Sequence, residues 1–392
     1  MKKCAFTVIL LLSFLLVSCK SNEVYQPSEA REMHLAAVES ISDDILYFTF
    51  ALERSRLIYT DVETGLTGVL CGRPECEHKS TDCNGYLGED VADFAICAGI
   101  SEFEDKLYYV LNDGVQISLY QMKKDGSAHR KVRRLSDVAD NSFPLSGGLQ
   151  TIVHQGYVFA AGTVTDIVDG KVQIKRKLMA YPLDDLDEEL TILSETVDSG
   201  YESILMMPAE NKLYYGISKT ELQEGETESS FQLMCWDIGN KTSEELFQGS
   251  TPDGLYEWAP DGENFIFTGA EYCGIYRLNL SEGFFETVGY FGGKESGFMT
   301  EYISDGKIIG FQYPDDGHLR IRAENTDGEE IVDCILARED IESGFAGRTF
   351  LGMRGSKMYY QYISETGTRE SLVMFDMESR EQIILRTAEL AE

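Results

Sequence analysis

Short runs of apolar and aromatic residues recur along the chain, and each run follows a polar turn. Inside a run, apolar and polar positions alternate, which is the pattern of a β-strand with one buried face. The runs recur at intervals of 43 to 61 residues. Their matched central positions are Leu46, Leu107, Tyr157, Leu213, Phe265, Ile308 and Met358. Seven repeated strands of this kind predict a repeat architecture.

A second apolar run follows each of these strands and ends in a turn rich in Asp, Asn and Gly. Residues 57–65 and 119–126 are clear examples, whereas residues 178–187 form a degenerate copy that contains Pro182. Alternating runs bounded by such turn residues are typical of hairpins. No segment shows a sustained helical period, and residues 382–390 form either a short helix or the closing strand.

Strand-rich units of about 50 residues indicate an all-β fold, and a β-propeller fits them best. We expect seven blades, with six or eight as alternatives, and a single propeller domain over residues 38–392. A pair of β-sandwiches is the structural alternative, and the even spacing of the repeats disfavours it. Because a closed ring hides its edge strands, we expect the last blade to borrow a strand from the other terminus. The candidate strands are residues 33–40 and 382–385.

The first residues have the three zones of a secretory signal. Lys2 and Lys3 supply positive charge, residues 5–17 are almost all apolar, and small residues precede Cys19. The apolar run is too short to cross a bilayer about 30 Å thick as a permanent helix. Its end, Leu-Val-Ser-Cys, resembles the lipobox of bacterial lipoproteins. This resemblance implies a signal peptide over residues 1–18 and lipid on Cys19; an ordinary secreted protein is the alternative. The polar composition of residues 19–37 predicts a solvated tether.

Acidic residues dominate the charge of the chain. There are 67 Asp and Glu against 34 Lys and Arg, which gives a formal net charge of −33. Such a surface repels nucleic acid, so we expect no nucleic-acid partner. Residues 123–134 are a basic exception built around Asp125-Gly126, and we interpret them as a solvated hairpin before a docking patch.

One loop concentrates residues that can bind a metal. Cys71, Cys76, His78 and Cys83 form the pattern C-x4-C-x-H-x4-C, and three thiols with one imidazole can enclose a tetrahedral zinc ion. Close cysteines outside the cell also form disulfides, and Cys97 is the candidate fourth partner for two bridges. Free thiols are the remaining alternative. We expect a structural loop, within the first blade or between that blade and the next. The remaining cysteines lie in strand patterns and are expected to be small buried residues: Cys235, Cys273 and Cys334.

Taken together, three features of the sequence resemble one group of proteins. The lipobox, the Leu-Tyr-Tyr strands with Asp-Gly turns, and the Cys–His loop are similar to those of uncharacterised propeller lipoproteins of clostridia-type bacteria. The strands also resemble TolB-like propeller repeats. The resemblance covers nearly the whole mature chain and implies a membrane location and a propeller fold. It implies no reaction.

The usual catalytic motifs are absent from the sequence: it has no G-x-S-x-G, H-E-x-x-H, P-loop or G-x-G-x-x-G pattern. The other histidines fall in the tether, the basic hairpin, a strand start and a turn: His34, His129, His154 and His318. We therefore expect a monomeric, non-enzymatic binding or scaffold module for an extracellular protein or glycan, with no catalytic residues assigned. Its ligand is expected at a mouth of the central channel or on the surrounding loops. The alternative is an extracellular hydrolase or lyase that acts on a saccharide or lactone at the channel mouth.

Overall fold

The computed structural model describes most of the chain after residue 40. It covers residues 41–42, 44–50, 56–87, 96–112, 117–135, 150–168, 171–185, 187–197, 201–223, 226–252, 255–269, 273–293, 298–304, 306–312, 319–336, 345–364 and 368–389. These residues form 28 strands in seven antiparallel sheets of four strands each. Four consecutive strands make each sheet, so the chain finishes one sheet before it begins the next.

The strand bounds follow the repeat. The first sheet contains β1 (Ile41–Ser42), β2 (Ile45–Thr49), β3 (Leu57–Asp61) and β4 (Thr67–Val69). The second contains β5 (Ile96–Phe103), β6 (Lys106–Asn112), β7 (Ile117–Lys123) and β8 (Arg130–Arg134). The third contains β9 (Gln150–His154), β10 (Tyr157–Val168), β11 (Lys171–Pro182) and β12 (Leu190–Val197). The fourth contains β13 (Tyr201–Ala209), β14 (Lys212–Gln223), β15 (Glu226–Asp237) and β16 (Thr242–Ser250).

The last three sheets have the same order. The fifth contains β17 (Leu255–Asp261), β18 (Asn264–Gly269), β19 (Gly274–Asn279) and β20 (Phe284–Tyr290). The sixth contains β21 (Met299–Ser304), β22 (Lys307–Gln312), β23 (Leu319–Asn325) and β24 (Glu330–Leu336). The seventh contains β25 (Phe345–Arg354), β26 (Lys357–Ser364), β27 (Arg369–Asp376) and β28 (Glu381–Glu389).

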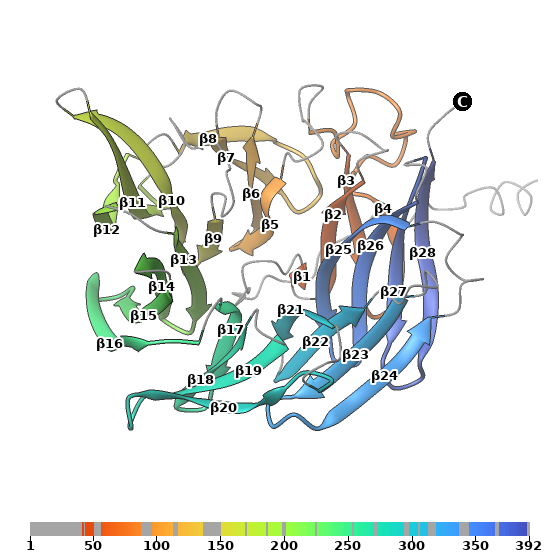
Figure 1. Ribbon diagram of the computed structural model, residues 1–392. Helices are drawn as coiled ribbons and strands as arrows, with labels where there is room; N and C mark the ends of the chain where they lie inside the picture. The colour runs from red at the N-terminus through yellow and green to blue at the C-terminus, as the bar shows by residue number, and fades with distance from the viewer. Residues whose placement is uncertain are drawn as a thin grey trace, which may run out of the picture.

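The sheets are the blades of a seven-bladed β-propeller, which confirms the predicted fold and blade number (Figure 1). First strands of neighbouring blades contact one another near the centre, as β1 does with β5 and β5 with β9, while fourth strands lie at the rim. Each of the seven matched sequence positions lies on the second strand of its blade. Residues 381–389 form a strand, so the helical alternative for this segment is wrong.

The core consists of separate layers between neighbouring blades. Tyr47 of the first blade packs with Tyr109 of the second, and Leu46 on the opposite face of β2 packs with Leu351 of the seventh. Each second strand is therefore buried on both faces, which explains why these strands have the most regular apolar pattern. A blade isolated from its neighbours would expose both layers, so the blades stabilise one another.

Turns repeat as faithfully as strands. In every blade, an Asp or Asn at or just beyond the end of the third strand accepts a backbone N–H two to four residues later: Asp61, Asp125, Asp185, Asp237, Asn279, Asn325 and Asp376. These Asx turns are the physical basis of the Asp/Asn-rich turns in the sequence.

The fourth strands carry a second repeated device. In blades two to seven, the pairing of the third and fourth strands shifts by one residue at a β-bulge. The extra residue is aliphatic each time: Val132, Ile192, Leu246, Val288, Ile331 and Leu385. A bulge twists an edge strand and weakens its ability to pair with a further strand, so these bulges blunt the rim.

One of the two strands expected to close the ring is not exchanged between blades. Blades one and seven each contain four strands of their own, and β28 pairs with β27, so the prediction of a borrowed strand from residues 382–385 is wrong. The other candidate, residues 33–40, lies outside the described residues. Side-chain packing joins the two blades, and Gln361 Nε2 donates a hydrogen bond to the Thr49 carbonyl oxygen at 2.8 Å. Apolar faces of both blades are therefore buried at this junction among the described residues.

The described part of the chain contains no helix long and apolar enough to cross a membrane.

Candidate metal centre

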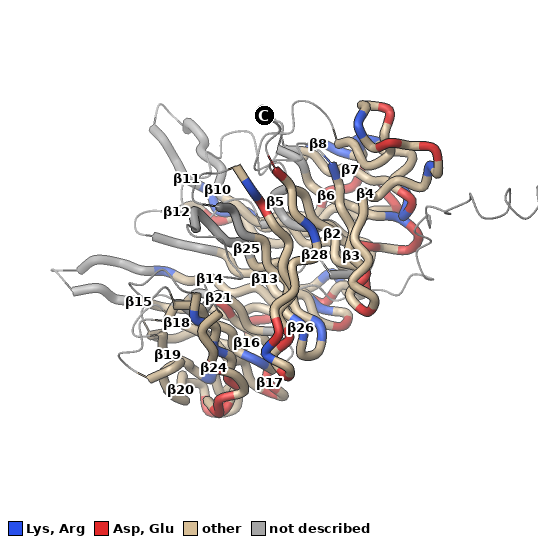
Figure 2. The backbone as a smooth tube through the Cα atoms, turned by 90° about the vertical axis from the view of Figure 1, so that its right-hand side faces the viewer, with Lys and Arg blue, Asp and Glu red and all other residues tan. Residues whose placement is uncertain are grey.

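The Cys–His loop connects the first blade to the second. It leaves β4 after Val69, and its described part runs to Leu87 before β5 begins at Ile96. Of the two placements expected from the sequence, the structure therefore has the one between blades. The charged side chains of Glu75, Glu77 and Lys79 are exposed on this loop, whereas Cys83 is buried. Figure 2 shows acidic and basic positions interleaved on the loops beside β4, β7 and β8.

All four predicted donors converge. The ligand atoms of Cys71, Cys76, His78 and Cys83 lie within 4.8 Å of one another, and they are the one such group of Cys, His, Asp or Glu found among the described residues. Donors around a tetrahedral zinc ion are separated by about 3.7 Å, given a Zn–S distance of about 2.3 Å. The four residues therefore fit a zinc ion after a contraction of about 1 Å. The three thiols are free and not joined in a disulfide.

Short backbone contacts shape the loop around its donors. The Cys76 amide donates to the Arg73 carbonyl oxygen at 3.1 Å, which forms a turn, and His78 takes a left-handed backbone with φ of 55°. The His78 amide then points at the Cys76 sulfur, 3.4 Å away, and His78 Nδ1 lies 3.5 Å from the Cys83 sulfur. An Arg73 guanidinium N–H donates to the Asp82 carbonyl oxygen at 2.7 Å and so ties the two ends of the loop together.

Burial and neighbouring groups shift the pKa values of the donors in this loop. Burial raises the pKa of the Cys83 thiol to about 12. Burial also opposes ionisation of Cys76, but the His78 amide and the neighbouring thiols bring its pKa below the ordinary value. Burial and the charges of Arg386 and Arg56 lower the pKa of His78, so the imidazole is neutral and its ring nitrogens are available to a metal. Three thiolates can share this small space only when a cation offsets their charge.

The second blade supports the loop from outside. The Gly72 amide donates to the Asp125 carbonyl oxygen at 2.8 Å. Gly126, with φ of +77°, lies so close that a Cβ atom there would be 2.3 Å from the Leu70 carbonyl oxygen. His129 links Asn84 to the blade core, with Nε2 2.6 Å from the Asn84 carbonyl oxygen. Its Nδ1 lies 2.9 Å from the Tyr109 hydroxyl group.

These contacts correct our interpretation of residues 123–134 as a merely solvated hairpin. The turn of this hairpin is the platform on which the Cys–His loop rests. Lys124 is buried there and forms an ion pair with Glu102. The equivalent position is apolar in the first and fourth blades, at Val62 and Ile238. The positive charge of Lys124 therefore hides its burial from an interpretation based on the local sequence.

The first blade depends on the loop as well. Its outer strand β4 has only three residues. Beyond it, the Leu57 amide donates to the Gly85 carbonyl oxygen at 2.8 Å, and Arg56 forms a β-bridge with Tyr86. The end of the Cys–His loop thus pairs with the start of β3, which the short strand β4 does not reach.

The remaining predicted residues have separate places. Cys97 lies in β5, but its side chain is not among those described, and Cys19, His34 and His318 lie outside the described residues. His154 is buried, with Nε2 2.7 Å from the Glu210 carbonyl oxygen. Cys235 is buried as expected. Two further cysteines, Cys273 and Cys334, are only half-buried, and none of these three is in a disulfide.

One group of chemical interest carried no signal in the sequence. Glu257 lies on β17, the first strand of the fifth blade, and burial raises the pKa of its carboxyl group to about 7. As one of 67 acidic residues, it has no motif or spacing that marks it. Likewise, Asn84 and His129 are 45 positions apart, and only the fold brings them together.

Comparison with known proteins identifies the fold and no family. No family model and no curated relative matches the sequence. A prolyl endopeptidase structure is 11% identical, with a TM-score of 0.56 over 93% of this chain and 50% of that chain. An acylaminoacyl peptidase in complex with Z-Gly-Gly-Phe-chloromethyl ketone is 12% identical, with a TM-score of 0.52 over 90% and 52% of the two chains. The chain spans about half the length of these peptidases, and the similarity at this identity concerns the fold alone.

Proposed function

We propose that this chain is a lipid-anchored, extracytoplasmic propeller that acts as a non-enzymatic binding or scaffold module for an extracellular protein or glycan. The positive start, the short apolar run and the Leu-Val-Ser-Cys sequence ending at Cys19 support export and lipidation. Its resemblance to clostridia-type propeller lipoproteins supports the same location. Lipid on the N-terminal cysteine would hold the propeller at the membrane through residues 19–37.

The closed donor set carries this proposal. Cys71, Cys76, His78 and Cys83 supply four protein ligands, and we propose that they hold a structural zinc ion. Catalytic zinc keeps an open position for water or substrate, whereas a four-ligand site is complete without either. The densest group of reactive side chains in the described residues is therefore suited to stabilising a junction between blades.

An extracellular hydrolase is the competing candidate. The peptidases with a similar fold give it weak support, because propellers serve many unrelated functions. One experiment distinguishes the binding module from the hydrolase. The purified mature protein is applied to glycan and protein arrays and to panels of peptide, saccharide and lactone substrates. We expect saturable binding without turnover. Turnover of any substrate at a rate proportional to enzyme concentration overturns the non-enzymatic proposal.

The anchor has its own test. Cells expressing the wild type, Cys19→Ala or Cys4→Ala are labelled with a clickable palmitate analogue and fractionated. Wild type and Cys4→Ala, whose change lies in the removed segment, should give labelled, membrane-bound mature protein. Cys19→Ala should be unlabelled and either unprocessed or released. Label and membrane retention in Cys19→Ala would show that another residue anchors the protein.

A further inference from the structure

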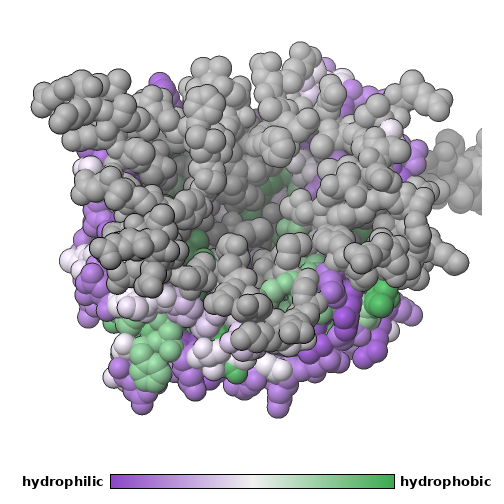
Figure 3. All heavy atoms as spheres, in the orientation of Figure 1, coloured by the Kyte–Doolittle hydropathy of each residue, from purple (hydrophilic) through white to green (hydrophobic). Residues whose placement is uncertain are grey.

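The rim of the propeller has two different halves. Large hydrophobic side chains that are exposed among the described residues all lie on or beside the fourth strands of blades five, six, seven and one, which are consecutive around the ring. They are Phe284, Tyr290, Ile331, Ile335, Ile383, Ile384 and Leu66. In contrast, the exposed residues of β8, β12 and β16 are all polar or charged. Figure 3 shows the lower rim, where hydrophilic residues predominate and separate hydrophobic patches interrupt them.

From this asymmetry we infer that the edge of β24 is a docking site for an extended, basic and apolar segment of a partner protein, which adds to the sixth blade as a further strand. The inference rests on the proposed binding function and names its surface and the chemistry of its partner. Strand addition supplies main-chain hydrogen bonds from the exposed edge, and side-chain contacts supply selectivity.

β24 offers the longest regular edge on the apolar half of the rim. The bulge of β24 lies near the start of the strand, at Ile331. Residues 332–336 then pair with β23 without interruption. In β28 the bulge lies mid-strand, at Leu385, and divides the edge. Among the described strands, β24 pairs with β23 alone. Ile335 on this strand is 58% exposed, the largest fraction of the seven apolar residues.

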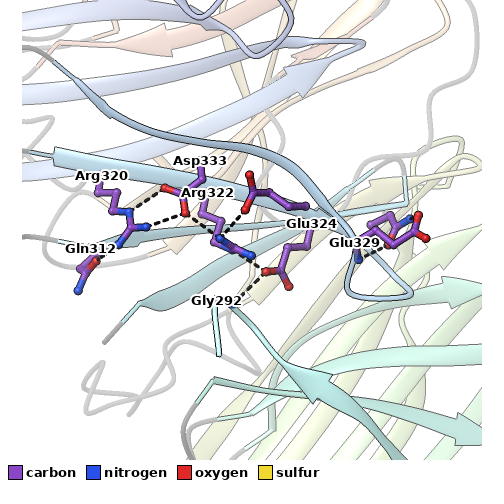
Figure 4. A network of polar contacts seen from close by, with 9 residues as sticks. Gly292, Gln312, Arg320, Arg322, Glu324, Glu329 and Asp333 are labelled. Atoms are coloured by element: carbon purple, nitrogen blue, oxygen red, sulfur yellow. Dashed lines mark hydrogen bonds and ion pairs between the residues drawn. The ribbon is translucent and has the colours of Figure 1, made fainter. Parts of the chain in front are cut away.

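An ionic network holds this edge rigid (Figure 4). Two guanidinium nitrogens of Arg320 donate to the two carboxylate oxygens of Asp333, each at 2.7 Å. Arg322 donates to the same carboxylate at 2.7 Å and also to Glu324. Glu324 in turn accepts a hydrogen bond at 2.9 Å from the amide of Gly292, which lies in the connection after β20. Because Asp333 lies between Ile331 and Ile335 along β24, the network fixes the strand before a partner arrives and lowers the entropic cost of binding.

Charge indicates what kind of segment fits. Glu282 and Glu286 on the fifth blade, Glu329 and Glu330 on the sixth and Glu381 on the seventh are exposed on or beside the strands that carry the apolar side chains. These acidic residues outweigh exposed Arg380, which lies in the turn before β28 and acts electrostatically on Cys334 of β24. The chain as a whole carries a formal net charge of −33, which disfavours a second copy or an anionic polymer at this edge. Branched aliphatic residues beside an open edge favour another β-strand. An extended segment that alternates basic and apolar residues fits the acidic residues, the negative net charge and the aliphatic edge together.

The test uses defined probes and matched variants. A fluorescent peptide that alternates Lys and Val is titrated into the mature protein, beside a Glu–Val peptide and a Lys–Val peptide N-methylated at alternate residues. The protein variants are Ile335→Lys and Thr242→Lys, which place the same charge at exposed positions on β24 and on β16 of the other half. Both changes are at exposed sites, so we expect each variant to fold, and thermal melting is the control for this.

We expect saturable binding of the Lys–Val peptide that is about tenfold weaker or more in Ile335→Lys and unchanged in Thr242→Lys. The N-methylated and Glu–Val peptides should bind no more than weakly. Bound peptide should also slow hydrogen exchange of the β24 amides. Absence of saturable binding, equal losses in the two variants, or equal binding of the N-methylated peptide would overturn the inference. Array ligands whose binding is insensitive to Ile335→Lys would leave the proposed function standing and refute this site alone.

Discussion

The hydroxyl group of Tyr359 in the seventh blade donates a hydrogen bond to the carbonyl oxygen of Val62 in the first blade, at 3.1 Å. The two residues are 297 positions apart, and both are buried. Lys357 Nζ reaches the same oxygen at 3.2 Å. The turn that follows the third strand of the first blade is therefore fastened directly to the blade that closes the ring.

Tyr359→Phe should weaken the closing junction. The change removes one buried hydrogen bond while Lys357 still reaches Val62, so we expect a loss of about 1 kcal/mol in the free energy of unfolding. Since closure supports every blade, the whole domain should unfold at lower urea in a single transition. Tyr290→Phe at an exposed rim position is the control. A separate early transition, confined to part of the signal, would show that the blades unfold independently.

The Cys–His loop should hold one zinc ion per chain. Native mass spectrometry should detect the ion in the wild type, and chelation should lower the melting temperature by about 5 °C or more, because binding energy at a structural site is folding energy. His78→Ala and Cys83→Ser should lose the metal, whereas Cys334→Ser on β24 should keep it. An intact mass lower by about four hydrogens, without metal, would instead indicate two disulfides that include Cys97.

Replacing Arg380 with glycine should increase the stability of the protein. It has φ of +60° in the turn after β27, the position that Gly65 and Gly283 occupy in other blades. A left-handed backbone strains a side chain and not glycine, so Arg380→Gly should stabilise the protein by about 0.5–1 kcal/mol. Glu378→Gly in the same turn is the control, and we expect it to be neutral or destabilising. Equal effects of the two changes on urea midpoints would contradict the turn geometry.

Glu257 should make stability fall as pH rises. Its pKa in the folded protein, about 7, lies above the ordinary value of 4.5, so the folded state binds this proton more tightly than the unfolded chain does. The contribution is complete below the unfolded pKa and is lost as the pH rises through 7. Glu257→Gln should therefore exceed the wild type by about 3 kcal/mol near pH 8 and nearly match it near pH 4.5. Glu286→Gln on exposed β20 should leave the pH profile unchanged, and an unchanged profile in Glu257→Gln would refute the burial of this carboxyl group.

Much of the fold was predictable because its signals are local. An alternating strand, a turn with an Asx side chain and a second strand depend on neighbouring residues, so Asp61 and Asp376 mark the same turn in the first and last blades. The blade number followed from the spacing of these strands. Ring closure was not predictable, because the packing of Leu46 on Leu351 joins residues from opposite ends of the chain and has no local pattern.

The candidate site divides in the same way. The sequence by itself determined that Cys71, Cys76, His78 and Cys83 share a loop short enough to enclose one ion. Only the tertiary structure decided that the thiols converge unpaired, that Asp125 and His129 support the loop, and that Lys124 is buried. These features depend on contacts between residues of different blades, and the spacing of those residues in the sequence does not indicate which of them meet. The apolar half of the rim is unpredictable from the sequence for the same reason. Ile335 and Ile383 have the pattern of ordinary strand residues, and only the packing of the ring decides that their side chains are exposed.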